Sequence, residues 1–273
     1  MASTFQVNII PDKLEFGEII IALLSDLDYH GFEENGSTIV AFISEDLFNE
    51  EILKTTLIPY SKNYTIKVIP YENWNAIWEA KFEPVLVNDF VSVRAKFHPP
   101  SSRTKYDIII TPKMSFGTAH HPTTFLMIQQ MQQLECTNKK VLDFGTGTGI
   151  LAILAAKMGA LDIVAIDNDE HSIENAKENI QVNDIENILV KQQDSIANAG
   201  TYEIILANIN LNIIMLNIEM MYGRLIAGGV MILSGFLSHD ADIIIEKCNS
   251  LHFTLDQKLK KDGWICLSFT RHM

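Results

Sequence analysis

A glycine-rich turn is the part of the sequence best suited to hold a small ligand. The segment Val141-Leu-Asp-Phe-Gly-Thr-Gly-Thr-Gly149 leads from an apolar strand through three glycines into the helical stretch Ile150-Leu-Ala-Ile-Leu. Such a turn brings backbone N–H groups at a helix N-terminus close to a bound group. Its G-x-G-x-G spacing differs from the G-x-G-x-x-G of dinucleotide sites, and the Lys-Ser/Thr of a phosphate-binding loop is missing. Taken alone, the turn is weak evidence for a ligand and is also compatible with a structural role.

An acidic residue at the end of the next strand favours a ligand site. The segment Ile163-Val-Ala-Ile-Asp167 places a carboxylate 22 residues after Gly145. At the carboxyl end of a parallel strand, such an acid can accept hydrogen bonds from both hydroxyls of a ribose. The alternative is a helix N-cap, because Asp169 and Glu170 also stand at the start of the next helix. Together, Asp167 and the glycines 145 and 147 predict S-adenosylmethionine as the cofactor, rather than NAD.

Two more polar residues follow the third and fourth strands of the same region. Asp194 is a candidate to meet the adenine amine of the cofactor, although Asp is also common in loops. Asn208 lies in Leu-Ala-Asn-Ile-Asn at the end of the fourth strand. Many methyltransferases that act on adenine or glutamine have an Asn followed by two prolines here, whereas this chain has Ile209 and Asn210. The difference predicts an acceptor nitrogen that is not planar and amide-like, with Asn208 as the catalytic residue.

The elements around these residues predict an α/β fold with a doubly wound, mainly parallel, Rossmann-like sheet. From Lys139 onward, short apolar strands alternate with helical stretches. The expected strands are Val141–Phe144, Ile163–Ile166, Ile188–Val190, Ile204–Ala207 and Val230–Leu233, and the expected helices are Gly149–Met158, Ile173–Asn183 and Ile213–Leu225. The segments Phe253–Asp256 and Trp264–Phe269 are expected to close the sheet as a pair of strands.

The region before this sheet divides into a small domain and a linker. Residues 1–70 predict a small α+β domain from strands Phe5–Ile10, Ser37–Ile43 and Tyr64–Ile69 and helices Lys13–Tyr29 and Glu45–Thr56. Residues 71–84 predict a linker helix, with Trp74 and Trp78 one turn apart on one face. Residues 85–273 form the expected larger domain, which starts with strands Val85–Val93 and Tyr106–Thr111 and the helix Thr123–Leu134.

Charge and composition disfavour several classes of protein. The 273-residue chain carries a formal net charge of −13, which argues against a nucleic-acid target. Residues 1–62 contain three lysines and eleven acidic side chains, a net charge of −8 that either favours solubility or attracts a basic protein partner. No apolar run approaches the roughly 18 residues of a membrane span, and residues 1–12 do not resemble a signal peptide. Cys136, Cys248 and Cys266 are an odd number and lack metal-ligand spacing, so we expect reduced, mostly buried thiols in the cytoplasm and no metal. We also expect a monomer.

Four signatures resemble the ribosomal protein L-eleven methyltransferase (PrmA) family, and the likeness covers nearly the whole chain. They are Trp74-x-x-x-Trp78-x-x-x-Phe82-x-Pro84, Phe116-Gly-Thr-Ala-His-His-Pro-Thr-Thr124, Val141–Ala160, and Ala207-Asn-Ile with Gly228–Gly235. The resemblance implies a small substrate-recognition domain, a helical linker and a domain that binds S-adenosylmethionine. It also implies trimethylation of lysine side chains and/or the N-terminal α-amine of one basic, large-subunit ribosomal protein.

Carried over by position, the resemblance implies cofactor contacts at Thr124, Gly145, Asp167 and Asn208. Phe116 is a candidate for an aromatic ring that faces the methylated cation. Two positions depart from the family pattern, because Ala119 replaces a glycine of the loop and Thr146 replaces a frequent cysteine.

Three other functions are compatible with parts of the pattern. An enzyme that methylates RNA or DNA bases would use the same cofactor, but the acidic charge and the missing prolines count against it. A regulatory module that binds the cofactor without turnover is disfavoured by Asn208, and an NAD oxidoreductase by Ile150 in place of the third glycine of its fingerprint. His120 and His121 are adjacent, and we expect them to shape their loop rather than to hold a metal.

Overall fold

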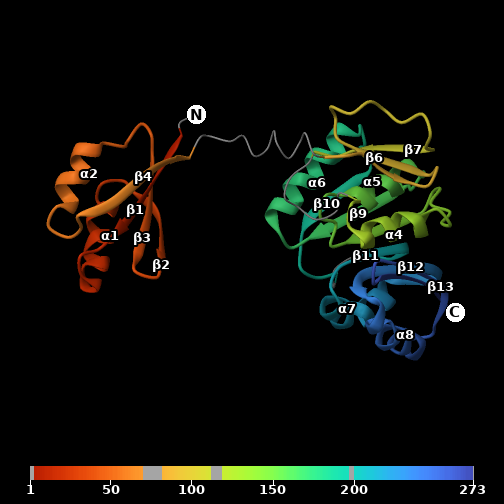
Figure 1. Ribbon diagram of the computed structural model, residues 1–273. Coiled ribbons are helices and arrows are strands. Elements are labelled where there is room, and N and C mark those ends of the chain that lie inside the picture. Colours follow the sequence, from red (N-terminus) through yellow and green to blue (C-terminus); the bar gives the residue numbers. More distant parts are fainter. Residues whose placement is uncertain (1–2, 70–81, 112–118, 197–199, 273) are drawn as a thin grey trace. The chain divides into compact units, whose positions relative to one another are not determined.

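The computed structural model describes residues 3–69, 82–111, 119–196 and 200–272. The chain forms two compact units, Met1–Lys81 and Phe82–Met273. Each is described by itself below (Figure 1). The predicted linker helix with Trp74 and Trp78, and the predicted contact at Phe116, lie outside the described residues.

The first unit is a β-α-β-β-α-β module with an antiparallel sheet in the order β2-β3-β1-β4, a ferredoxin-like arrangement. Its elements are β1 (Thr4–Ile10), η1 (Leu14–Phe16), α1 (Gly17–Ser25), β2 (His30–Asn35), β3 (Thr38–Ser44), α2 (Glu50–Leu57) and β4 (Asn63–Ile69). Alternate residues of β1 and β3, such as Val7 and Ala41, are fully buried against Leu24 and Leu53 of the two helices. Both helices therefore cover one face of the sheet.

The second unit contains a seven-stranded sheet in the order β10-β9-β8-β11-β12-β14-β13. Its strands are β8 (Lys140–Phe144), β9 (Asp162–Asp167), β10 (Ile188–Gln192), β11 (Tyr202–Asn208), β12 (Leu225–Leu237), β13 (Phe253–Lys261) and β14 (Trp264–Arg271). The first five strands in this order are parallel, and β14 is antiparallel to both of its neighbours. The predicted doubly wound, mainly parallel sheet is confirmed.

The strand order reverses between β8 and β11. From β8 the chain continues to β9 and β10 on one side of the sheet, and from β11 it continues to β12 on the other side. In open α/β sheets, ligands bind at such a switch point, at the carboxyl ends of the strands. The helices of the unit are α4 (Pro122–Met131), α5 (Ile150–Lys157), α6 (Glu170–Val182), α7 (Leu211–Arg224) and α8 (Ala241–Ser250), with the short η2 (Ser238–Asp240) before α8. The glycine turn and Asn208 therefore border the switch point from its two sides.

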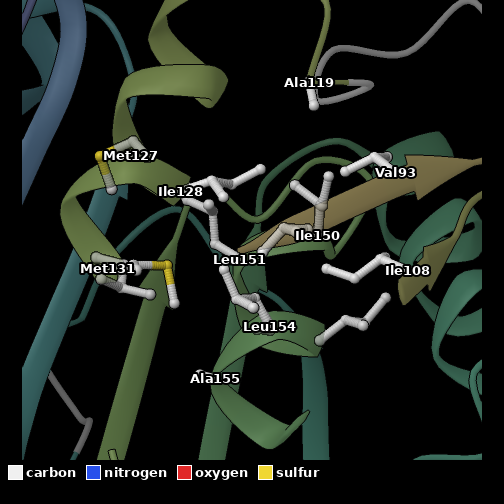
Figure 2. Packing of buried hydrophobic residues seen from close by; sticks show 14 of the residues in the cluster. Val93, Ile108, Ala119, Met127, Ile128, Met131, Ile150, Leu151, Leu154 and Ala155 are labelled. Carbon is white, nitrogen blue, oxygen red and sulfur yellow. The ribbon is translucent and has the colours of Figure 1, made fainter. Parts of the chain in front are cut away.

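A second, three-stranded sheet packs on the helix that follows the glycine turn. It consists of β5 (Val85–Val87), β6 (Val91–Arg94) and β7 (Tyr106–Ile109). The prediction of one strand over Val85–Val93 was wrong, because the chain turns at Asn88, where φ is +54°, and β5 pairs back on β6. Figure 2 shows Val93 and Ile108 of this sheet converging on Ile150 and Leu154 of α5. Because α5 is covered on two sides, its first six residues are all buried.

Two of three asparagines spaced along α6 and its C-cap satisfy backbone groups in β7 and just after it. Asn175, Asn179 and Asn183 recur every fourth residue, on one face of the helix, and all are at most 9% exposed. Asn183 accepts a hydrogen bond from the N–H of Ile109 (3.0 Å) and donates to its carbonyl (2.6 Å), as a neighbouring strand would. Buried backbone groups need such partners, so the Asn183 amide takes the place of a neighbouring strand at Ile109.

All three cysteines lie buried in the second unit. Burial raises the pKa of Cys136 to about 11 and that of Cys248 to about 12, and it also raises the pKa of Cys266. At neutral pH the three thiols are therefore protonated and sit in the apolar core.

The carboxyl group of Asp143, in β8, anchors the glycine turn from within the core. It is fully buried and accepts hydrogen bonds from the Thr146 hydroxyl (2.6 Å) and the Ala152 N–H (3.2 Å). Its other oxygen, Oδ1, has no hydrogen-bond partner among the described residues. Burial raises the pKa of Asp143 to about 7, against the lowering effect of the two hydrogen bonds, and the charge of Asp167 raises it further.

This raised pKa makes stability depend on pH. Between about pH 4 and 7 the native protein holds a proton on Asp143 that the unfolded chain has lost, so the free energy of unfolding falls as pH rises. Asp143→Asn keeps an acceptor for Thr146 and Ala152 and removes the titration. We expect this variant to lose up to about 1.4 kcal/mol per pH unit of that slope in urea unfolding between pH 5 and 7. Glu246→Gln, at an exposed site on α8, is the control, and equal slopes in the parent and Asp143→Asn would contradict the prediction.

Candidate functional site

The glycine turn folds back over the end of the neighbouring strand β9. The N–H groups of Gly145 and Thr146 both donate to the carbonyl of Ile166, at 2.9 and 3.0 Å. Gly145 has a φ of +77°, and a Cβ placed on it would lie 2.1 Å from Cγ2 of Ile209. Only glycine fits this position, because the left-handed backbone and the close approach both exclude a side chain. The turn thus brings backbone from β8, β9 and the end of β11 to one edge of the sheet.

Asp167 stands at the carboxyl end of β9, where the sequence predicts a ribose ligand. Its Oδ2 accepts the N–H of Gly147 (2.9 Å), and its Oδ1 accepts the N–H of Asp169 (3.1 Å). The N-cap of α6 is Asp169, which accepts the N–H of Ser172, so the alternative role considered for Asp167 belongs to its neighbour. Asp167 is half-buried and each of its oxygens retains a further lone pair, so the carboxylate can accept two hydroxyl groups.

Asp194 lies in the exposed segment after β10. Gln193, the residue before it, donates its N–H to the carbonyl of Asp167 at 2.8 Å. This hydrogen bond places the start of the exposed segment beside the candidate ribose ligand, so Asp194 belongs to the same edge of the sheet.

Asn208 and Thr124 are 84 residues apart in sequence and in contact in the fold. The Asn208 side chain, at the end of β11, donates from Nδ2 to the Thr124 hydroxyl at 3.2 Å. Thr124 is 2% exposed and belongs to the first turn of α4. The Oδ1 atom of Asn208 is buried, and no described residue donates to it. An amide oxygen of this kind is costly to leave unpaired, which suits it to accept an N–H group from a ligand.

His121 fixes the start of α4, as the sequence predicts. Its Nδ1 accepts the N–H of Thr123 (3.3 Å) and lies 2.7 Å from the Thr123 hydroxyl, and Pro122 follows as the first helical residue. Burial lowers the pKa of His121, which favours the neutral ring that this cap requires. His120 contacts the Glu83 carbonyl through Nε2 at 3.0 Å. Within the described ranges, no group of three His, Cys, Asp or Glu side chains could hold a metal ion.

Asn179 of α6 joins the glycine turn to the chain that follows β7. Its Oδ1 accepts the N–H of Thr111 (2.7 Å), and its Nδ2 donates to the carbonyl of Thr148 (2.8 Å). Neither Asn179 nor Asp143 was among the predicted site residues. The signal that could have found the asparagine was its repeat every fourth residue on a helix, a spacing more often read as a solvated face.

Comparison with known proteins identifies the family. The family model of ribosomal protein L11 methyltransferase (PrmA) matches residues 22–272. A ribosomal protein L11 methyltransferase of Porphyromonas gingivalis is 36% identical over 281 aligned residues, which cover 99% of this chain and 97% of that protein. One of Phocaeicola vulgatus is 35% identical over 92% of both chains.

A solved structure agrees with these sequence matches. The ribosomal protein L11 methylase of Lactobacillus delbrueckii subsp. bulgaricus superposes with a TM-score of 0.65 at 27% identity, over 70% of this chain and all of that one. No helix of the described residues has the length and apolar character of a membrane span. The chain belongs to the ribosomal protein L11 methyltransferase (PrmA) family.

Proposed function

We propose that this protein transfers methyl groups from S-adenosylmethionine to amines of ribosomal protein L11, in the cytoplasm and as a monomer. The acceptors are lysine side chains and/or the N-terminal α-amine, each taken up to the trimethylated state. One observation carries the proposal: beside the glycine turn, Asn208 has a buried amide oxygen that no described residue engages. The relatives are ribosomal protein L11 methyltransferases, which supports the same substrate for this chain.

The residues at the edge of the sheet suit the proposed cofactor. Asp167 would accept the two ribose hydroxyls, and Asp194, in the neighbouring exposed segment, would meet the adenine amine. The turn at Gly145 and Gly147 allows a close approach to the cofactor, and Thr124 would line its methionine end. Phe116 keeps its proposed role facing the cationic product. When bound, S-adenosylmethionine supplies an electrophilic methyl group on a sulfonium.

The chemical requirement on the protein is to bind and orient a neutral amine. Deprotonating a lysine with an ordinary pKa of about 10.4 costs roughly 4–5 kcal/mol at pH 7, whereas an α-amine near 8 costs about 1 kcal/mol. A carbonyl oxygen can accept an N–H hydrogen bond from the neutral amine. The lone pair of the amine nitrogen then stays free to point at the methyl group. The Oδ1 atom of Asn208 would act in this way, while its Nδ2 remains held by Thr124.

The first unit is the proposed recognition module for the basic substrate. It carries the excess of acidic side chains in residues 1–62, which favours association with a positively charged protein. Its domain limits are proposed as residues 1–70, followed by a linker at 71–84 and the methyltransferase domain at 85–273.

The test of the function is methylation of purified ribosomal protein L11. We expect mass increments of up to three methyl groups on single amines, at a rate that rises with pH as the amine deprotonates. Asn208→Ala should lower turnover by about 10- to 1000-fold, because an oriented hydrogen bond to the amine is lost. Its affinity for the cofactor should change much less. Asn212→Ala, an exposed amide in the first turn of α7, is the matched control. Labelling of ribosomal RNA with L11 untouched would refute the proposal.

Asp167→Ala tests the cofactor site. The variant loses the proposed ribose hydrogen bonds, each worth about 1.5–3 kcal/mol to a charged acceptor, so affinity for S-adenosylmethionine should fall at least about tenfold by calorimetry. Asp169→Ala removes the N-cap of α6 instead and should lower stability by about 1 kcal/mol with little effect on affinity. Equal affinities in the parent and Asp167→Ala would remove Asp167 from the site.

Charge reversal in the full-length chain tests the recognition role of the first unit. Glu18→Lys with Glu33→Lys, both exposed, should slow association with L11 by roughly 3- to 10-fold at low salt, and the difference should shrink as salt rises. The control pair is Glu186→Lys with Glu246→Lys, exposed in the second unit. If both pairs slow association equally, the acidic first unit has no special part in recognition.

A further inference from the structure

Ile209, the residue after Asn208, is bracketed by two glycines from the strands on either side of it. In the sheet, β11 lies between β8 and β12. Gly145 follows β8 and meets the Ile209 side chain, because a Cβ at Gly145 would lie 2.1 Å from Cγ2 of Ile209. Gly235 of β12 meets the Ile209 backbone, because a Cβ there would lie 2.3 Å from its carbonyl oxygen and 2.8 Å from its nitrogen.

The contact with Gly235 is built into the strand. The register between β12 and β14 shifts between Ser234 and Phe236, so Gly235 is the extra residue of a β-bulge, and its φ is +98°. A side chain at 235 would strike backbone atoms of Ile209, which cannot rotate away as a flexible side chain can. The bulge at Gly235 therefore leaves room for the backbone of Ile209, directly after the end of β11.

A backbone hydrogen bond holds Ile209 in this position between the two glycines. Its N–H donates to the carbonyl of Ser234 at 3.1 Å and continues the pairing of β11 with β12 by one residue. Proline has no N–H group and could not make this bond. The bond gives a physical reason why this chain does not follow Asn208 with the proline found in enzymes that methylate planar nitrogens.

We propose that Ile209, seated between Gly145 and Gly235, is a positioning residue that sets the distance and direction of the Asn208 amide relative to the glycine turn. The inference rests on the proposed function, because Asn208 is the residue that would orient the amine. Thr124 holds the Asn208 side chain laterally, through the 3.2 Å hydrogen bond to Nδ2. Ile209 fixes the backbone from which that side chain projects. Loss of the packing between Ile209 and the two glycines would displace the Oδ1 atom of Asn208. The hydrogen bonds of Asp167 to its own loop would remain.

The first experiment separates kcat from cofactor affinity. Gly235→Ala should lower kcat for L11 methylation at least tenfold, with the Kd of S-adenosylmethionine changed by less than threefold. Gly228→Ala is the matched control, since Gly228 lies on the same strand with a φ of +76° and nothing within 4 Å of an added Cβ. Both variants place alanine at a positive φ (+98° at Gly235 and +76° at Gly228), and only the alanine at 235 strikes Ile209. Equal kcat values in the two variants would overturn the proposal.

A second comparison introduces no backbone strain and serves if Gly235→Ala does not fold. Ile209→Val keeps the Cγ2 methyl that touches Gly145, and Ile209→Ala removes it. The Val variant should retain most of kcat, and the Ala variant should lose at least fivefold, with the Kd of the cofactor little changed in either. Equal kcat values for Val and Ala, or a loss that appears entirely in cofactor affinity, would reject the positioning role.

A stability cycle tests the contact without any substrate. Gly145→Ala should lower the melting temperature, and adding Ile209→Ala should recover part of that loss, because the 2.1 Å clash with Cγ2 disappears. If the changes in melting temperature of the two single variants simply add in the double variant, the contact between Gly145 and Ile209 is not made. That result would reject the packing of Ile209 against Gly145, whichever substrate the enzyme methylates. The two variants could instead show non-additive melting temperatures while the parent protein does not methylate L11. That outcome would reject the proposed function, and with it the role of Ile209 in turnover.

Discussion

The glycine turn is held because three consecutive residues, 146–148, are each bonded to a different element. The first bonds the buried Asp143 of β8, the second bonds Asp167 of β9, and the third bonds Asn179 of α6. A turn with this much left-handed backbone has little intrinsic stability, since glycine loses the most conformational freedom on folding. These hydrogen bonds to buried or half-buried side chains offset that cost. The rest of the site is arranged around the loop that they fix.

The two ends of the Asn208 amide are unequal, and the inequality matters for the proposed reaction. Nδ2 has a partner in Thr124, whereas Oδ1 has none among the residues that the structure describes. A neutral primary amine can offer that oxygen two N–H groups and a monomethylated secondary amine one, whereas a neutral dimethylated tertiary amine offers none. The dimethylated and the trimethylated nitrogen therefore both leave the buried oxygen unpaired. In the proposed reaction this hydrogen bond can orient the amine in the first two transfers, and a third transfer would proceed without it.

Much of the larger sheet could be predicted from the sequence, because its central strands are short apolar runs that end at a glycine, an acid or an amide. The turn between β5 and β6 could not, since it depends on a left-handed Asn88 within a continuous apolar run. Strand β2 and helix α8 were also missed, because His30–Asn35 lacks apolar alternation and Ala241–Ser250 mixes apolar and charged residues. The contact of Thr124 with Asn208 was not predicted, although the family resemblance named both residues as cofactor contacts, because no local pattern pairs residues 84 positions apart.

The distribution of the buried thiols has a practical consequence. Thiol reagents attack the thiolate, and at pH 7 a thiol with a pKa near 11 is ionised in roughly one molecule in ten thousand. All three cysteines lie in the second unit, and the first 81 residues contain none. Modification of a thiol therefore requires the second unit to open, whereas opening of the first unit exposes no cysteine and produces no modification. The intact protein thus carries a natural reporter that distinguishes the opening of one unit from that of the other, with no label and no truncation.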